Sequence, residues 1–221
     1  NMEGLTGTNP SVGSVLVKND EIISLASTGY NGTPHSEFSL LNKIDKKITK
    51  GSSLYVTLEP CSHYGKTPPC TNIIIDKKVS RLVFGAHDID ERSSKRAKQI
   101  LKSKKIKVKY VNLPIIKEFY KPYIFQRKYK QPYVVGKIAC SKDFFIKNSK
   151  SKYISNTYTQ SFSHHLRYKN QAILVTYKTI NEDNPLLDCR LPGLNEYSPI
   201  KVIIDKNLKI KKNANIFKLK N

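Results

Sequence analysis

The sequence has 221 residues, of which 39 are Lys or Arg and 17 are Asp or Glu, so the formal charge is +22. This length suits one large domain or two small ones. Hydrophobic residues make up 38% of the chain and aromatic residues 10%, which is enough for a folded core and argues against disorder throughout.

Several protein classes are excluded by what the sequence lacks. No run approaches the ~18 consecutive apolar residues of a membrane span, so we expect no membrane partner. Four cysteines are too few for a disulfide scaffold, which favours a reducing, cytoplasmic location. The lysines are spread along the whole chain. We interpret them as solvated surface charge, and a nucleic-acid partner is not expected.

The first half of the chain alternates short apolar runs with turn signals. Runs at 12–17 and 22–26, joined by the turn at 18–21, predict a β-hairpin. The elements expected next are a helix carrying Phe38, Leu41 and Ile44, a strand at 54–58, a helical stretch around 73–75, a strand at 82–84, a helix at 92–102 and a strand at 108–111. This order predicts a layered α/β domain with helices on both faces of one sheet.

The pattern breaks around Pro122, where aromatic and basic residues follow one another. We therefore predict a domain boundary near residues 126–131, with one domain at 1–126 and a second at 131–221. The elements expected in the second domain are strands at 133–140, 172–176 and 201–204 and a helix at 159–168.

The aromatic residues Phe119, Tyr120 and Tyr123 lie close to this boundary. Large aromatic side chains bury much apolar area wherever they pack. The sequence leaves two roles open for them, an interface between copies of the chain and a core between the two domains.

Four further residues of potential interest lie in the second half. Cys140 and Cys189 have no metal-ligand partner nearby in the sequence, and we expect both to be small buried residues. His164 and His165 are adjacent on a predicted polar helix, where neighbouring side chains diverge by about 100°. They are therefore not expected to share one ligand site.

A set of metal-ligand residue types lies in the first half. His35-Ser36-Glu37 opens one predicted helix, and Cys61 and Cys70, each preceded by proline, flank the start of the next. One histidine and two thiolates can hold Zn²⁺ and leave the fourth tetrahedral position for water, as a catalytic zinc requires. Zinc lowers the pKa of such a water. Glu37 is placed to carry protons between the water and a substrate.

A His-x-Glu segment on one helix and two proline-preceded cysteines on another are typical of zinc deaminases. Other interpretations remain open. Nucleotide and tRNA deaminases carry Pro-Cys-x-x-Cys, whereas eight residues separate Cys61 from Cys70, which argues against them. A basic nucleic-acid-binding protein that keeps zinc without turnover is a further alternative, which the intact Glu37 disfavours.

The segment from Tyr55 to Cys70, YVTLEPCSHYGKTPPC, resembles nearly residue for residue the signature of the bifunctional riboflavin-biosynthesis deaminase/reductase family. The segments NPSVG at 9–13 and PHSE at 34–37 match two further motifs of that family in the right order. The resemblance implies a three-layer α/β/α cytidine-deaminase-like domain, followed by part of a dihydrofolate-reductase-like α/β domain.

The resemblance also implies an activity for the first domain. It is expected to be a zinc hydrolase that removes the 2-amino group of a phosphorylated pyrimidine, 2,5-diamino-6-(ribosylamino)-4(3H)-pyrimidinone 5′-phosphate, and releases ammonia. In this comparison the metal ligands are His35, Cys61 and Cys70, and the catalytic proton carrier is Glu37. The implied substrate contacts are Asn9, His63, Lys66 and Asp88.

From Gln131 onward the chain resembles the family's reductase domain, which uses NADPH to reduce the ribosyl group to ribityl. The implied substrate contacts there are Ser151, Arg167, Leu187 and Arg190, and the implied NADPH contacts are Ala139, Tyr153, Thr179 and Asp183. Arginine suits bidentate binding of phosphate. The match stops at 200–205, so we expect a partial domain whose reductase activity is open. Proteins with this resemblance are often homo-oligomers, and we expect one here.

Overall fold

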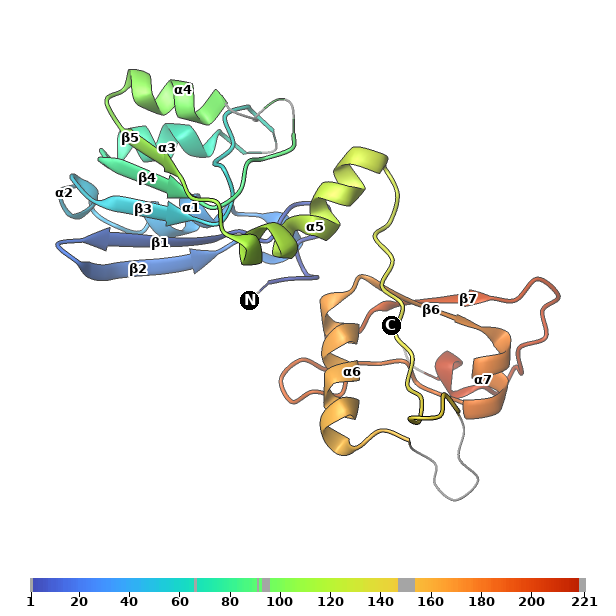
Figure 1. Ribbon diagram of the computed structural model, residues 1–221. Helices are drawn as coiled ribbons and strands as arrows, with labels where there is room; N and C mark the ends of the chain where they lie inside the picture. Colours follow the sequence, from blue (N-terminus) through green and yellow to red (C-terminus); the bar gives the residue numbers. More distant parts are fainter. Residues whose placement is uncertain (1, 66, 91, 93–95, 147–153, 219–221) are drawn as a thin grey trace. The chain divides into compact units, whose positions relative to one another are not determined.

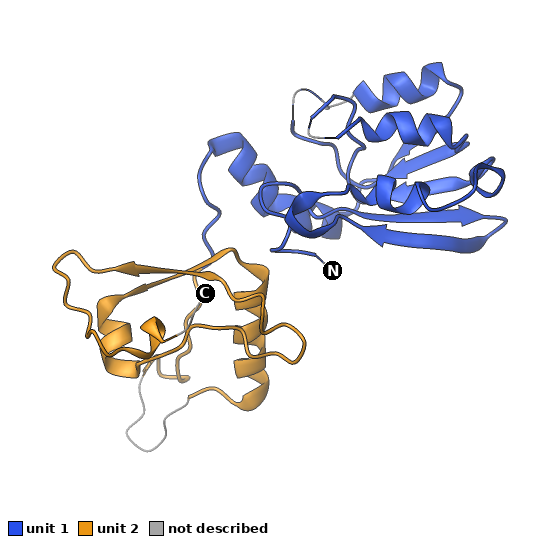
Figure 2. Cartoon of the chain, turned by 180° about the vertical axis from the view of Figure 1, so that it is seen from behind, with its two compact units in different colours: residues 1–135 blue, residues 136–221 orange. Residues whose placement is uncertain are grey.

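The computed structural model describes residues 2–65, 67–90, 92, 96–146 and 154–218. The chain divides into two compact units, residues 1–135 and 136–221 (Figure 2), and each is described by itself. That the boundary between two domains lies at 126–131 stays a prediction.

Unit 1 is built on a mixed sheet with the strand order β2-β1-β3-β4-β5 (Figure 1). The strands are β1 Gly13–Lys18, β2 Glu21–Ser27, β3 Ser53–Val56, β4 Arg81–Phe84 and β5 Lys107–Tyr110. β1 pairs antiparallel with β2 and β3, whereas β3, β4 and β5 run parallel. The predicted hairpin and the three later strands are confirmed. The parallel strands bring the loops that follow β3 and β4 to one edge of the sheet.

One face of this sheet is covered by α1 Ser36–Leu41, α3 Cys70–Asp76 and α4 Arg96–Ser103. Alternate strand residues and one stripe of each helix meet in a core whose most buried members are Leu16, Leu40, Leu41, Leu54, Ile74, Leu82 and Leu101. The helix expected to include Ile44 ends earlier, and the short α2 Lys46–Thr49 follows it. The Asp45 side chain caps α2 by accepting a hydrogen bond from the Lys47 N–H at 2.7 Å.

The aromatic and basic stretch interpreted as a break is instead part of α5, Pro114–Tyr129. Pro122 lies inside this helix, on its exposed side, and Glu118, whose carbonyl loses its donor, is exposed as well. Water can hydrate that carbonyl, which lowers the cost of the proline. α5 has 16 residues, and no helix in the described part of the chain is long and apolar enough to cross a membrane.

The inner side of α5 closes a second core at the carboxyl ends of the strands. Its apolar residues recur at helical spacing and pack on Val12, Leu58 and Ala86; they are Ile116, Tyr120, Tyr123 and Ile124. This spacing indicates a helix, but the sequence analysis interpreted Pro122 as a break in the pattern.

Tyr120 fixes α5 to the sheet. Its ring is 1% exposed, its hydroxyl donates to the Ser11 carbonyl at 3.0 Å, and the same oxygen lies 2.6 Å from the Thr57 hydroxyl. Thr57 in turn accepts from the Gly13 N–H at 3.0 Å. Tyr120 therefore belongs to the core of unit 1, and both roles considered for it from the sequence, an oligomer interface and an inter-domain core, are wrong.

Unit 2 contains the parallel pair β6 Ala172–Thr176 and β7 Ile200–Ile204, with helices α6 Thr157–Lys169 and α7 Tyr177–Asp183 (Figure 1). One face of the strands packs on a core made of Ile180, Leu187, Ala214 and Ile216. The helix predicted at 159–168 and the strands predicted at 172–176 and 201–204 are confirmed.

Two predictions for the second half are wrong. The stretch 133–140 forms no strand, and its residues Val134 and Ile138 are 80% and 75% exposed. A strand needs a pairing partner, which an apolar run alone does not supply. Cys140, at the end of that stretch, is consequently exposed, whereas Cys189 is buried as expected.

We predict that Tyr120→Phe lowers the free energy of unfolding of unit 1 by about 1 kcal/mol, because the half-buried Ser11 carbonyl loses its donor. Hydrogen exchange of the β1 and β3 amides measures this free energy. Tyr129→Phe is the matched control on the same helix, since Tyr129 is 52% exposed. Equal protection in both variants would contradict the assignment.

Candidate metal centre

Two connections at the carboxyl edge of the unit 1 sheet, from β2 to α1 and from β3 to α3, deliver the predicted metal ligands. His35 is the residue before α1, and its carbonyl accepts the Ser39 N–H at 2.9 Å. Cys61 lies in the loop after β3, and Cys70 is the first residue of α3. The Thr71 N–H donates to the Cys61 carbonyl at 3.2 Å, which holds this loop against the start of α3.

The ligand atoms of His35, Cys61 and Cys70 all lie within 4.8 Å of one another. The His35 Nδ1 atom is 3.5 Å from the Cys61 Sγ atom and 3.3 Å from the Cys70 Sγ atom. A tetrahedral zinc with bonds of about 2.0 Å to nitrogen and about 2.3 Å to sulfur separates these atoms by about 3.5 Å. The donor set and its spacing therefore fit zinc.

Hydrogen bonds within the cluster favour a thiolate at Cys61. The Cys70 thiol donates to it and lowers its pKa to about 4, and the Cys70 backbone N–H adds a hydrogen bond at 3.2 Å. The hydrogen bond between the two thiol groups also raises the pKa of Cys70, and the Cys61 sulfur raises the pKa of His35. Because thiolates are the form that binds metal, these hydrogen bonds favour the ligand form of Cys61 even without a bound ion.

Glu37 lies in the first turn of α1 and is 3% exposed. Burial raises the pKa of its carboxyl, and the negative charge of Cys61 adds to the effect. The Ser36 hydroxyl donates to Glu37 Oε2 at 3.1 Å and orients the group. A buried carboxyl with a raised pKa takes up and returns a proton more readily near neutral pH.

Asn9 is held beside the loop that carries His35. Its Nδ2 donates to the Gly32 carbonyl at 3.1 Å. Gly32 has a φ of +83°, and a Cβ there would lie 2.6 Å from the Asn9 Cβ and from the Thr6 carbonyl oxygen. Only glycine fits this approach, so the 29–33 loop fixes the predicted substrate contact.

Asp88, in the loop after β4, is 8% exposed, and burial raises the pKa of its carboxyl. Its Oδ1 accepts from the Asp90 N–H at 3.0 Å and from the Tyr123 hydroxyl at 3.1 Å. The charge of Asp88 also contributes to the raised pKa of His35, after larger effects in the same direction from Cys61 and Glu37, while burial of the ring opposes them. Tyr123 was not predicted as a site residue. Its position three residues after Tyr120 on α5 is the sequence feature that could have indicated its role.

The loop between the two cysteines is described only in part. Lys66 lies outside the described residues. His63 is near the loop after β4, because its charge adds to the effect of Arg92 in lowering the pKa of Asp90. Contact of either residue with substrate stays a prediction.

In unit 2, the structure brings Arg167 and Arg190 together around Asp188, while Leu187 packs in the core. Ser151 and Tyr153 lie outside the described residues. Thr179 and Asp183 are on α7, and Ala139 lies in an irregular segment. Contact of these residues with NADPH stays a prediction.

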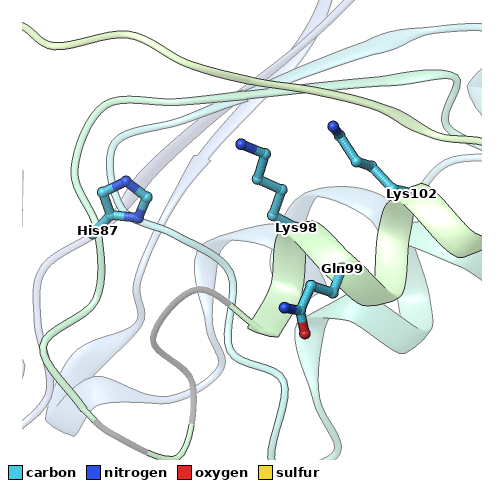
Figure 3. A pocket seen from close by; sticks show the side chains of 4 residues that line it. All are labelled: His87, Lys98, Gln99 and Lys102. Carbon is cyan, nitrogen blue, oxygen red and sulfur yellow. The ribbon is translucent and has the colours of Figure 1, made fainter.

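A pocket of about 450 Å³ opens beside α4, separately from the ligand cluster (Figure 3). Lys98 and Lys102 extend from one side of that helix, and His87 lies on the loop next to it. Buried Glu59 accepts a hydrogen bond from His87 Nδ1 at 2.9 Å. The pocket contains none of the predicted site residues, and Glu59 connects its wall to the Cys61 loop.

Two family comparisons match successive parts of the chain. The cytidine and deoxycytidylate deaminase zinc-binding region matches residues 2–86. The RibD C-terminal domain matches residues 132–221. The first match contains Glu37 and all three predicted ligands, His35, Cys61 and Cys70, and stops just after β4.

Curated relatives resemble the chain over nearly its whole length. The riboflavin biosynthesis protein RibD of Bacillus amyloliquefaciens is 35% identical over 217 residues, covering 97% of this chain and 58% of the relative. RibD of Synechocystis is 33% identical over 209 residues, covering 93% and 56%. The chain thus spans less than two thirds of the length of these relatives.

Solved structures agree with the fold. A diaminohydroxyphosphoribosylaminopyrimidine deaminase/5-amino-6-(5-phosphoribosylamino)uracil reductase from Thermotoga maritima has a TM-score of 0.85 and 34% identity, over 93% of this chain and 59% of that one. RibD of Acinetobacter baumannii has a TM-score of 0.83 and 28% identity, over 97% and 62%. The chain therefore has a cytidine-deaminase-like fold followed by a dihydrofolate-reductase-like one, as the sequence predicted.

We predict that the purified chain binds one zinc ion and that Cys61→Ser lowers the zinc affinity at least tenfold, because a neutral hydroxyl replaces a thiolate ligand. Competition with a chromogenic chelator measures the affinity. Cys140→Ser is the control, since Cys140 is exposed. Loss of zinc in the Cys140 variant, or its full retention in the Cys61 variant, would contradict the ligand assignment.

Proposed function

We propose that the chain is a member of the RibD family of riboflavin biosynthesis proteins and that unit 1 is a zinc-dependent pyrimidine deaminase. Its proposed substrate is 2,5-diamino-6-(ribosylamino)-4(3H)-pyrimidinone 5′-phosphate, which loses its 2-amino group as ammonia. The observation that carries the proposal is the convergence of His35, Cys61 and Cys70 beside a buried Glu37. The nucleotide or tRNA deaminase and the non-catalytic alternatives are not favoured.

The proposed chemistry needs a nucleophile and a proton carrier. His35, Cys61 and Cys70 would hold the zinc ion, which would lower the pKa of a water and make a nucleophile available near neutral pH. The Glu37 carboxylate is proposed to accept a proton from the attacking water and to pass it to the pyrimidine ring nitrogen and then to the departing amino group. The Ser36 hydroxyl keeps the carboxylate in place during both transfers.

The proposed substrate contacts surround this centre. Asn9, held by Gly32, meets the pyrimidine, and Asp88, held by Tyr123, lies on the loop after β4. His63 and Lys66 contribute from the loop between the cysteines, with Lys66 as a point charge for the phosphate. The fixed geometry of Asn9 and Asp88 supports rigid positioning of the ring.

For unit 2 we propose binding of the ribosyl phosphate at Arg167 and Arg190, as in the reductase part of the family. Ser151 and Leu187 are proposed to lie near this substrate. NADPH is proposed to contact Ala139, Tyr153, Thr179 and Asp183. Because Ser151 and Tyr153 lie outside the described residues, we derive no reduction step for this chain.

We further propose that the chain acts on small molecules in the cytoplasm and assembles as a homo-oligomer. Four cysteines, two of which are metal ligands in this account, fit a reducing compartment. Phe119, which is 37% exposed on α5, remains available to such an interface.

We predict that Glu37→Gln lowers the rate of ammonia release at least about 100-fold, because the amide cannot carry the proton. The assay uses the zinc-loaded chain and the diaminopyrimidine ribosyl phosphate, with zinc content measured in parallel. Glu118→Gln is the control, since Glu118 is exposed on α5 and pairs only with Lys121 among the described residues. NADPH oxidation is followed on the deaminated product.

Ammonia release that is lost in the Glu37 variant and kept in the Glu118 variant, with zinc unchanged, would support the deaminase. Absence of release from the zinc-loaded wild-type chain would overturn it. NADPH consumption by the wild-type chain would establish that unit 2 also reduces the product.

A further inference from the structure

His164 is the centre of a hydrogen-bonded cluster in unit 2. It lies on α6, three residues before Arg167, and faces the loop that carries Asp188 and Arg190. Arg167 Nη1 donates to the Asp188 carbonyl at 2.9 Å, and the Cys189 thiol donates to the His164 carbonyl at 3.6 Å. These hydrogen bonds hold the loop of residues 188–190 against α6 at His164.

The contacts of His164 Nδ1 determine which ring nitrogen carries the proton. The Arg190 backbone N–H donates to Nδ1 at 3.1 Å, and Arg167 Nη1 lies 3.2 Å from the same atom. The Asp188 carbonyl is also 3.2 Å from Nδ1, but a proton on Nδ1 would leave the Arg190 backbone N–H without its acceptor. Two donors at Nδ1 require a lone pair there, so the proton is on Nε2. Burial and the charges of Arg167 and Arg190 lower the pKa of His164, which favours its neutral form.

With the proton on Nε2, this ring nitrogen and the Arg190 guanidinium both present N–H donors on the same side of the cluster. His164 Nε2 lies 3.4 Å from Arg190 Nη2. Two N–H groups this close cannot bond to each other, and a single acceptor oxygen can satisfy both. Arg190 Nη1, on the other side of the guanidinium, pairs with the Asp188 carboxylate at 3.4 Å. Two arginines against one carboxylate leave the cluster with a net positive charge, which favours an anion.

We propose that His164 completes a phosphate-binding site with Arg167 and Arg190. Its Nδ1 fixes the Arg190 backbone, and its Nε2–H donates to the phosphate oxygen that Arg190 Nη2 also binds. This inference rests on the proposed function of unit 2 and adds a third binding residue with a defined tautomer. His165 takes no part, since its ring packs near Tyr168, with ring centroids 6.1 Å apart.

The test measures binding of ribose 5-phosphate to the zinc-loaded full chain by NMR titration, with ribose as the ligand that lacks phosphate. His164→Leu removes both ring nitrogens and is expected to weaken binding about tenfold or more. His164→Gln returns an N–H donor near the Nε2 position and is expected to recover part of the affinity. His165→Leu is the matched control and is expected to bind as the wild type does.

A second measurement reads the tautomer directly. Long-range ¹H–¹⁵N spectra of the imidazoles distinguish a protonated Nε2 from a protonated Nδ1, and we expect protonated Nε2 at His164, with a shift of that signal on adding ribose 5-phosphate. A protonated Nδ1, or no shift on saturation, would overturn the role of His164. The amide spectrum of unit 2 checks that each variant is folded.

The outcomes separate this inference from the function on which it rests. If Arg190→Ala abolishes binding while His164→Leu and His164→Gln bind as the wild type does, the role of His164 is wrong and the arginine site stands. If the wild type shows no saturable binding, or if Arg190→Ala binds equally well, the phosphate site of unit 2 is wrong as well. Neither result bears on ammonia release, which depends on Glu37 in unit 1.

Discussion

The convergence of His35, Cys61 and Cys70 depends on the parallel pairing of β3 with β4. This pairing places the loop after β3 and the start of α3 at one edge of the sheet, where α1 also begins. Backbone hydrogen bonds from Cys70 and Thr71 to Cys61 then set the two sulfur ligands against each other. Three ligands from two loops can form a fixed metal site because one rigid sheet carries both loops.

The polar residues around this centre are held by the same edge of the sheet. Glu59, next to the Cys61 loop, is anchored through its N–H to Ala86 and through its carboxylate to His87. Tyr123, on α5, donates to Asp88 in the loop after β4. Because α5 packs across these loops, a change in its position would alter the loop of Asp88 together with the second core of unit 1.

The sequence predicted the parts that depend on local pattern. Strands β1 to β5 follow apolar runs, and the ligands follow from residue types at characteristic spacings. It did not predict α5, because Pro122 normally ends a helix and its tolerance here depends on exposure. The contacts of Tyr123 with Asp88 and of His164 with Arg190 join residues 35 and 26 positions apart. Such pairings depend on tertiary structure, which no local pattern specifies.

The central claim is a zinc ion with three protein ligands and an open fourth position. X-ray absorption at the zinc edge of the loaded protein tests it most directly. The account predicts two sulfur neighbours at about 2.3 Å, one nitrogen at about 2.0 Å and one oxygen neighbour that hydroxide or substrate can occupy. Four protein ligands, or fewer than two sulfur neighbours, would contradict it, because a closed site holds no water for deamination and a sulfur-poor site excludes Cys61 or Cys70.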